Sequence, residues 1–543
     1  MHFRSSIHND AHQAQAAHDC QLETTESPYT QSILMTSKRR YVVFAVMLAT
    51  FLAAVDMTIV DTALPRIVGS LGGFSMFTWL VTAYLLTSTA LVPAYGKLAD
   101  ILGRKKVFTL GTVIFLLGSA LCGQANDMVQ LILFRGLQGL GAAGILPVVQ
   151  TIIGDIYSPA ERAKMQGWFS SVWGLSALLG PLVGGVIVDH FSWRWLFYIN
   201  LPLGALALVM LHIYFDEKVA DRQASVDYTG SAFLVFGISA FMLGLLEGGS
   251  RFAWTSPPIL GLFACAAILG VLFIRQEYRH DDPILPPDLF RNRTIFTANL
   301  AQLFLGGVLY SATVYLPLWA QGVQGFSATR SGASLLWLSI GWPLASAIGG
   351  RVILQVGQRP AAILGLIFTT AGAAALLILD HRVAGIPEAG FGIVTFCIGS
   401  GMGFATLSFM LGVQSAVGWE QRGVATASLQ FIRTLGGLIW VAIMGAVMNL
   451  TLASELQKMP KLGILNMSQA ASFANNLLDP DIWARMTPDD LTMARSALAD
   501  SLRQVHWVTL LCSVIALLIT LKLPNRMYSF DLASRASEST PVP

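Results

Sequence analysis

Asp56, Asp61 and Arg135 are ionisable side chains that stand inside long apolar segments of this chain. Charged groups inside a membrane are energetically costly and usually serve a function. Arginine keeps its charge, so a carboxylate beside it is the group that can bind and release a proton. A low-dielectric surrounding favours the neutral carboxylic acid, whereas a nearby arginine favours the carboxylate. These residues therefore predict proton exchange, with a cation able to compete with the proton for the same carboxylate.

The depth of these residues indicates which of them meet. Asp56 lies about 15 residues into the segment 41–64, or ~22 Å along a helix. Arg135 lies ~10 Å from the start of the segment 128–152, which runs in the opposite direction. We expect Asp56 and Arg135 to be coupled, directly or through water; the alternative is that Asp56 only holds Arg135 in place. Asp61, ~140° further around the helix, is either a second proton or cation site or a hydrated polar residue near the outer surface.

Fourteen apolar stretches must position these groups, and each is long enough to cross the ~30 Å hydrocarbon core as a helix. The chain is 54% hydrophobic and only 12% charged, whereas soluble domains carry roughly 25% charged residues. Its mean hydropathy is +0.61. Helices are expected because lipid leaves no partner for unpaired backbone groups. The sequence predicts an all-α integral membrane protein with spans at about 41–64, 77–95, 107–124, 128–152, 166–188, 195–213, 229–246, 258–275, 295–320, 331–350, 361–380, 389–413, 428–450 and 504–522.

The positive charges predict the orientation, because Lys and Arg collect on the cytoplasmic side of membrane proteins. With the N-terminus inside, most cations fall on inner loops, and an even number of spans returns the C-terminus to the cytoplasm. The net charge of +3 then reflects topology, and a soluble basic face for nucleic acid is not indicated. The inner cations are Lys38, Arg39, Arg40, Lys97, Arg104, Lys105, Lys106, Arg162, Lys164, Lys218, Arg222, Arg275, Arg279, Arg291, Arg293, Arg351, Arg359 and Arg422.

Three segments lie outside the predicted spans. Residues 1–40 are polar, lack the features of a signal peptide, and are expected to form a disordered cytoplasmic tail. Their histidines could alternatively form a metal-binding tract, and Met35 offers an alternative start. Residues 523–543 form a second cytoplasmic tail. The outer loop 451–503 has apolar residues at helical spacing, which predicts an amphipathic helix on the membrane surface or, alternatively, a lid over the substrate.

Several other classes of protein are disfavoured. The sequence has no phosphate-binding loop, so ATP use is not expected. Clustered residues with catalytic or metal-binding spacing are lacking, so we expect neither an enzyme nor a metal or other cofactor. Five cysteines show no pairing or metal-binding pattern. A receptor would need a soluble signalling domain, and no segment outside the predicted spans is long enough for one. A channel is disfavoured because two duplicated halves are typical of alternating access.

A short loop after the second apolar stretch carries Gly96, Asp100, Gly103 and Arg104, followed by two lysines. The glycines permit a tight turn, and Asp100 can cap the next helix or pair with Arg104. An ordinary inner loop would have the cations but not this order of residues. The loop resembles the signature loop of the major facilitator superfamily. The resemblance implies two six-helix bundles that rock about a central cavity, with these four residues in a cytoplasmic gate.

Further motifs narrow the resemblance to the fourteen-spanner drug:proton antiporters of that superfamily. The run from Asp56 to Pro65 resembles their first-span motif, and Arg135-x-x-Gln138-Gly139 resembles a fourth-span motif. The stretch from Trp193 to Pro202, which includes Asn200, follows the fifth span as in that branch. The fifth span itself resembles the antiporter motif, through Gly167, Gly180, Pro181, Gly184 and Gly185.

The residues of the fifth-span motif have two interpretations. Small residues allow close packing of helices in any membrane protein. A glycine followed by proline also interrupts the helical hydrogen bonds and produces a kink. The resemblance implies that this segment is a gate between the two halves that limits proton leak.

The chain departs from the family pattern at three positions. Asp61 stands where the first-span motif usually has asparagine, and Ser176 stands where the antiporter motif usually has glycine. In the second-half copy of the signature loop, residues 350–359, Leu354 replaces the acid. This half-length echo supports an internal repeat, with bundles at 41–213 and 295–522 and two extra spans in the linker 214–294.

The resemblance implies a proton-coupled secondary transporter in the cell membrane that exports lipophilic, cationic compounds. The oligomeric state stays open, with a monomer favoured. The alternative is a dedicated exporter of a metabolite, antibiotic or siderophore, and coupling to sodium instead of protons stays open. Because residues 331–350 contain no acid, monovalent or amphiphilic cargo is favoured over divalent cations. Large adaptable side chains suit promiscuous binding. The candidate cavity residues are Tyr84, Gln138, Tyr310, Tyr315 and Phe409.

Overall fold

The computed structural model describes most of the chain and is helical throughout the described part. The described residues are 28–157, 159–215, 217, 227–248, 252–280, 283, 286–378, 388–418, 421–458 and 487–525. Within these ranges the only β pairing is an isolated bridge between Gly248 and Phe252. The all-α prediction is therefore confirmed for the part of the chain that the structure describes.

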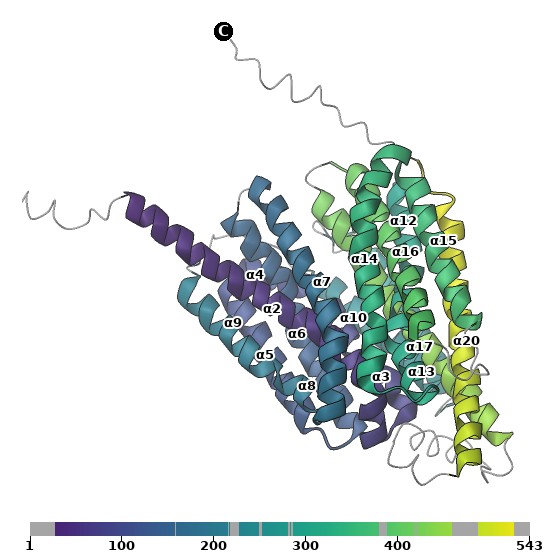
Figure 1. The fold of residues 1–543 in the computed structure, drawn as a ribbon. Coiled ribbons are helices and arrows are strands. Elements are labelled where there is room, and N and C mark those ends of the chain that lie inside the picture. Colours follow the sequence, from purple (N-terminus) through teal and green to yellow (C-terminus); the bar gives the residue numbers. More distant parts are fainter. Residues whose placement is uncertain are drawn as a thin grey trace, which may run out of the picture.

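The first half of the chain forms one group of packed helices (Figure 1). Within this group α2 packs against α7 and α9, and α6 packs against α3 and α5. Its elements are α2 (Pro28–Leu71), η1 (Phe74–Met76), α3 (Phe77–Ala90), α4 (Val92–Leu102), α5 (Arg104–Gln124), α6 (Met128–Ile156), α7 (Pro159–His190), α8 (Trp195–Tyr198) and α9 (Asn200–Tyr214).

The second half forms a second group, in which α16 packs against α14 and α15, and α17 packs against α12 and α20. A π-helical turn, η3, follows α12 directly. The elements are η2 (Pro287–Arg291), α12 (Arg293–Tyr310), η3 (Ser311–Tyr315), α13 (Leu316–Gly322), α14 (Ala328–Val356), α15 (Gln358–Ile378), α16 (Glu388–Ser415), α17 (Arg422–Gln457) and α20 (Pro488–Thr520).

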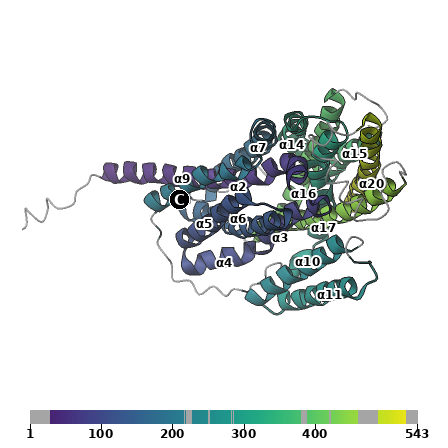
Figure 2. The same ribbon diagram turned by 90° about the horizontal axis from the view of Figure 1, so that it is seen from below.

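A helical hairpin connects the halves. It consists of α10 (Tyr228–Glu247) and α11 (Pro257–Glu277) and lies to one side of both groups (Figure 2). α10 packs against α3 and α17, one helix from each half, whereas only 6% of the most apolar part of α11 is buried. This arrangement agrees with the two extra linking spans of the predicted architecture, and a largely uncovered apolar helix such as α11 is suited to lipid.

All fourteen predicted apolar stretches fall on helices. Twelve helices of the described part are long and apolar enough to cross a membrane. Of the other two stretches, 229–246 falls on a shorter apolar helix, Thr229–Leu245. The stretch 77–95 is divided between α3 and α4, because α4 restarts with Pro93 in its first turn. The structure is thus consistent with fourteen spans.

Both ends of the predicted outer loop 451–503 are extensions of its flanking helices. α17 continues to Gln457, and α20 begins at Pro488 and runs without a break into the last span. Apolar residues at helical spacing were predicted here, and Ala494, Leu498 and Leu502 are indeed buried. The helix is a continuation of the span and not a separate helix on the membrane surface. The rest of this loop lies outside the described residues.

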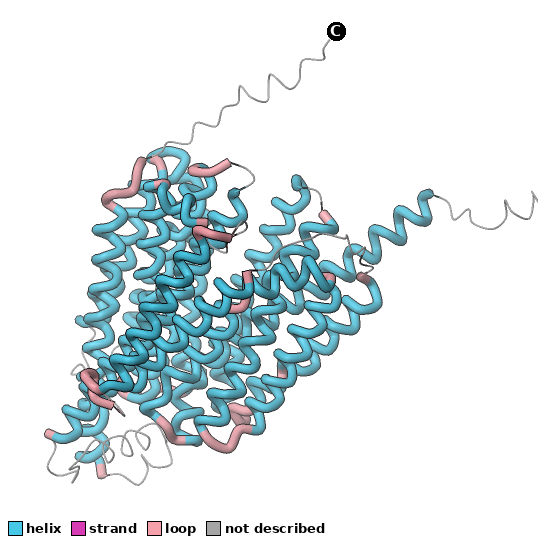
Figure 3. The backbone as a smooth tube through the Cα atoms, turned by 180° about the vertical axis from the view of Figure 1, so that it is seen from behind, coloured by secondary structure: helices cyan, strands magenta, loops and turns pink. Residues whose placement is uncertain are grey.

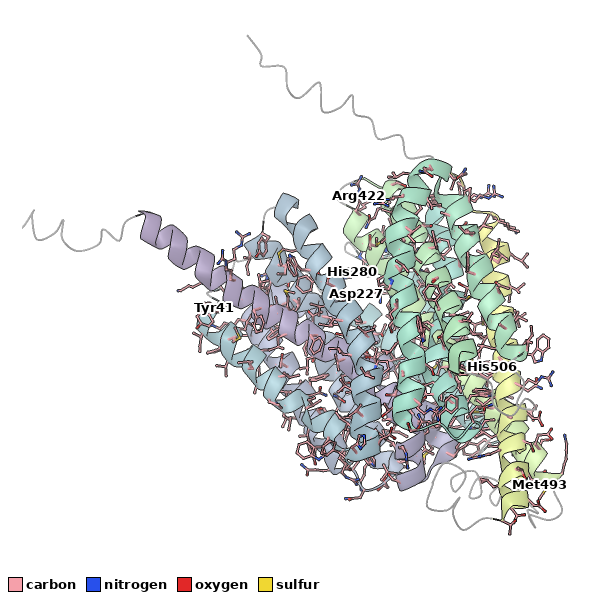
Figure 4. All side chains as sticks on the ribbon, in the orientation of Figure 1. Tyr41, Asp227, His280, Arg422, Met493 and His506 are labelled. Atoms are coloured by element: carbon pink, nitrogen blue, oxygen red, sulfur yellow. The ribbon has the colours of Figure 1, made fainter. Side chains whose placement is uncertain are left out.

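The two halves converge at one end and diverge toward the other, as views from opposite sides show (Figures 1 and 3). Met493 lies at the end where they converge and Arg422 at the end where they diverge (Figure 4). Direct contacts between the halves come from α7 against α14, α3 against α17 and α13 against α2. These helices therefore enclose the space between the halves, where the candidate site lies.

Candidate functional site

A buried polar network surrounds the Asp56 carboxylate inside the first half. Arg135 Nη1 donates to Asp56 Oδ2 at 2.7 Å, which forms an ion pair. Gln138 Nε2 and Asn200 Nδ2 each donate to Asp56 Oδ1 at 2.8 Å. Asp56 is 0% exposed. Buried charges are tolerated when they are paired and fully hydrogen-bonded, and this carboxylate meets both conditions. The structure thus brings Asp56 and Arg135 into the direct contact expected from their depths.

The network continues through two further side chains. Arg135 Nη1 also donates to Gln138 Oε1 at 2.8 Å, which fixes the orientation of the Gln138 amide. Ser119 accepts from Asn200 Nδ2 at 2.9 Å and donates to the Phe197 carbonyl at 2.8 Å. Helices α2, α5, α6 and α9 each contribute one side chain or more. These hydrogen bonds therefore connect four helices of the first half through one buried polar network.

Two members of this network were not predicted as site residues. Asn200 belongs to the stretch from Trp193 to Pro202 that carried part of the family resemblance, so a signal for it was present. Ser119 lies in an apolar helix, where a single hydroxyl has no distinguishing pattern in the sequence.

The Arg135 guanidinium lies at the edge of this network, against aromatic rings. Its centre is 4.1 Å from the ring centroid of Tyr84 and 5.9 Å from that of Phe197. Arginine favours such stacking because its planar cation interacts with the face of the ring. Arg135 and Tyr84 both border a cavity, whereas Asp56 does not.

That cavity has a volume of about 580 Å³ and lies between the two halves. Its wall is mainly apolar and aromatic, and the charged residues in it are Asp61 and Arg135. Cavities of this size and composition are typical of sites for small organic molecules. The lining residues are Met57, Thr58, Asp61, Val81, Tyr84, Leu85, Arg135, Trp173, Gly174, Ala177, Pro181, Leu309, Tyr310, Thr313, Leu335, Leu338, Ser339, Trp342, Pro343, Ser346, Thr406, Leu407 and Met410.

Two of the five predicted cavity residues, Tyr84 and Tyr310, line this cavity. The other three lie elsewhere. Gln138 is fully buried in the Asp56 network. Tyr315 donates its hydroxyl to the Val441 carbonyl at 2.7 Å and is 0% exposed. Phe409 is also fully buried, and its neighbour Met410 lines the cavity instead.

The signature loop lies at the end where α4 meets α5. Gly103 has a φ of 96°, which a residue with a side chain rarely adopts, and an added Cβ would lie 2.7 Å from Glu217. The Glu217 carboxylate accepts from the backbone amides of Arg104 and Lys105, the first two residues of α5. An acid at a helix N-terminus is favourable because it satisfies free amides and complements the helix dipole.

Glu217 therefore connects the signature loop to the segment that follows α9, a contact that no sequence pattern predicted. Gly96 lies in α4 with open space around it. The Asp100 side chain, predicted to cap the next helix or pair with Arg104, lies outside the described part of the structure.

The glycines of α7 allow it to approach one helix from each half. An added Cβ at Gly180 would overlap Thr58, and one at Gly184 would lie 2.8 Å from the Ile59 carbonyl, both on α2. An added Cβ at Gly185 would lie 2.6 Å from Thr329 Cα on α14. Pro181 lies inside α7 and lines the cavity. The surroundings of Gly167 lie outside the described side chains.

Polar contacts join α7 and α14 where the halves converge. The Asp189 carboxylate accepts from the backbone amides of Ala328 at 3.1 Å and Thr329 at 2.7 Å, so an acid of α7 caps α14. Ser339 donates to the Ala177 carbonyl at 2.7 Å. The packing role of the α7 glycines is thus visible, and it lies at the boundary between the halves.

A helical membrane protein with two packed halves, an apolar cavity between them and buried charges beside it has the architecture of a secondary transporter. The family model of the Major Facilitator Superfamily matches residues 46–441. The chain therefore belongs to the major facilitator superfamily and is a multi-pass membrane transport protein, not an enzyme.

Similar proteins of known sequence include two from Bacillus subtilis (strain 168). The chain is 38% identical to "Multidrug transporter protein MdtP", over 89% of this chain and 93% of that protein. It is 35% identical to "Multidrug resistance protein 3", over 81% and 85% respectively. A fungal relative, "Efflux pump FUS6" of Gibberella moniliformis, is 32% identical over 76% of this chain and 75% of that protein.

Solved structures support the same fold at low sequence identity. A bacterial homolog of the human lysosomal transporter Spinster has a TM-score of 0.60 and 16% identity, over 90% of this chain and 98% of that one. A D-xylose-proton symporter has a TM-score of 0.57 and 13% identity, over 89% and 98% respectively. These likenesses concern the fold alone.

Proposed function

We propose that this protein exports lipophilic, cationic compounds across the cell membrane in exchange for protons, by alternating access. Two of its relatives are multidrug proteins by name and are 38% and 35% identical to it over the aligned residues. The apolar and aromatic wall of the cavity suits organic cargo of varied shape. Both termini would lie in the cytoplasm, as the distribution of Lys and Arg indicates.

The observation that carries this proposal is the Asp56–Arg135 pair beside the cavity. Asp56 is sealed from the cavity by its partners, while Arg135 reaches both Asp56 and the cavity wall. For Asp56 to exchange a proton, the Arg135 guanidinium must move away from it, since it holds one carboxylate oxygen. Movement of Arg135 would link protonation of Asp56 to the contents of the cavity, which is the coupling that antiport requires.

The contacts between the halves supply the second requirement. The pair of helices α7 and α14 is closed by Asp189 and by glycine-mediated packing, while the opposite ends of the halves diverge. With the proposed orientation, the diverging end faces the cytoplasm, where cargo would enter. Rocking of the halves would then open the α7–α14 boundary toward the outside.

Transport by reconstituted protein tests the proposal. In proteoliposomes with an imposed pH gradient, wild-type protein should drive ethidium against its gradient, and an uncoupler should abolish this. Asp56→Asn keeps the shape and loses the titratable group, so gradient-driven transport should fall to the level of empty vesicles. Asp56→Glu, which keeps the acid, should retain part of the activity. Unchanged proton-driven transport by Asp56→Asn would refute the role of this carboxylate.

A further inference from the structure

Asp61 is an acidic residue that the Asp56 network does not use. It lines the cavity, is 5% exposed, and forms no ion pair with any Lys, Arg or His among the described residues. The other charged residue of the wall, Arg135, is already paired with Asp56. An ionised carboxylate in an apolar site is unfavourable unless a cation or strong donors accompany it. The cavity therefore contains a carboxylate that a positively charged ligand would complement.

The side chains near Asp61 come from the opposite half of the molecule. Thr313 and Tyr310, at the junction of α12 and the π-helical turn η3, line the same cavity as Asp61. π-helical turns are rare and often occur at functional sites. Helix α2 contacts η3 directly, so Asp61 and these hydroxyls face each other across the boundary between the halves.

Aromatic rings complete the surroundings of a bound cation. Trp173 belongs to the same cavity wall, as do Tyr84 and Trp342, whose rings already lie against the guanidinium groups of Arg135 and Arg433. The faces of such rings attract organic cations, most strongly when water is excluded. Asp61 is the one acid in the cavity wall without an ion-pair partner among the described residues, so the site offers one compensating negative charge. One such charge suits a monovalent cation. The second positive charge of a divalent ligand would have no partner there.

We infer that Asp61, with Tyr310 and Thr313 across the cavity, is the subsite that recognises the positive charge of a monovalent organic cation. This inference rests on the proposed export function, and it separates two tasks: Asp56 carries the proton and Asp61 selects the cargo. It also gives a reason for the departure at position 61, where the resembling motif usually has a neutral asparagine. Chains with asparagine there would lack this source of cation preference.

The substitution Asp61→Asn tests the inference, because it removes the charge and keeps the size. Initial rates of export from proteoliposomes are measured for ethidium, a permanent monovalent cation, and for Nile red, an uncharged dye. We expect the KM for ethidium to rise about 10-fold or more, since a desolvated charge pair is lost. The KM and maximal rate for Nile red should change less than about two-fold. Asp61→Glu should restore most of the preference.

Asp288→Asn serves as the matched control, because Asp288 is 81% exposed and pairs with Arg291, three residues further along the chain, on the surface. It should leave both dyes unaffected. Equal loss of ethidium and Nile red export in Asp61→Asn would overturn the inference, because it would assign Asp61 to coupling or folding. An unchanged ethidium KM would overturn it as well.

Binding without a gradient separates this inference from the proposed function. Ethidium affinity of detergent-solubilised protein is measured by tryptophan fluorescence quenching for the wild type and Asp61→Asn. Affinity that falls about 10-fold in the variant would support the cation subsite, even if transport by the wild type were insensitive to an uncoupler. In that case only the proton-coupled part of the account would fail.

Discussion

At the residue scale, the carboxylate of Asp56 is buried and accepts hydrogen bonds from Arg135, Gln138 and Asn200. Depth along two antiparallel helices was enough to place the two charges together, because helix geometry fixes position along the axis. The same reasoning could not find Ser119, since a hydroxyl in an apolar helix often bonds its own backbone and gives no signal. It also could not tell that Met410 lines the cavity while Phe409 does not. Neighbouring residues of a helix point about 100° apart, and the sequence does not determine how the helix is rotated about its axis.

The geometry of Arg135 gives a prediction at this scale. In Arg135→Lys the charge stays, but one ammonium cannot reproduce the planar contacts with Asp56, Gln138 and Tyr84. Proton-driven ethidium export should fall by roughly 10-fold or more at equal amounts of folded protein. Arg291→Lys, in an exposed pair, should have no effect. Full activity of Arg135→Lys would show that charge alone suffices there.

At the scale of elements, the helices coincide closely with the apolar stretches. The π-helical turn η3 is a local irregularity that the apolar pattern did not predict. The π-helical turn η3 adds a residue to one turn of the helix that follows α12. It therefore shifts the phase of the helix that follows. Tyr315, the last residue of this turn, donates to the Val441 carbonyl and does not line the cavity. A period of 3.6 residues cannot reveal such a shift.

The packing of α7 on α14 yields a second prediction. In Gly185→Leu a bulky side chain would meet the backbone of Thr329, so the two helices must separate. We expect a loss of stability of about 1–3 kcal/mol, seen as a lower melting temperature of the purified protein, together with faster proton leak into proteoliposomes. Gly261→Ala on α11 is the control, since an added Cβ there meets nothing within 4 Å. Normal stability and leak in Gly185→Leu would contradict the close approach.

At the scale of the whole molecule, composition predicted a helical membrane protein, and the family resemblance with its half-length repeat implied two bundles; the structure confirms the helical architecture. What the sequence could not supply is the contact between the halves. Asp189 and the amides of Ala328 and Thr329 lie about 140 positions apart in the chain, and backbone amides carry no sequence signal. The cavity depends on such contacts, because its wall is assembled from seven helices and a π-helical turn.

The central claim is that cargo and proton are exchanged through Asp56 as the halves rock. Release of protons on binding of cargo tests it most directly. Detergent-solubilised protein in weakly buffered solution is titrated with ethidium while a pH-sensitive dye reports the protons released. The account predicts release by the wild type and none by Asp56→Asn that still binds ethidium. Equal release by both proteins, or ethidium binding to the wild type without any release, would contradict it.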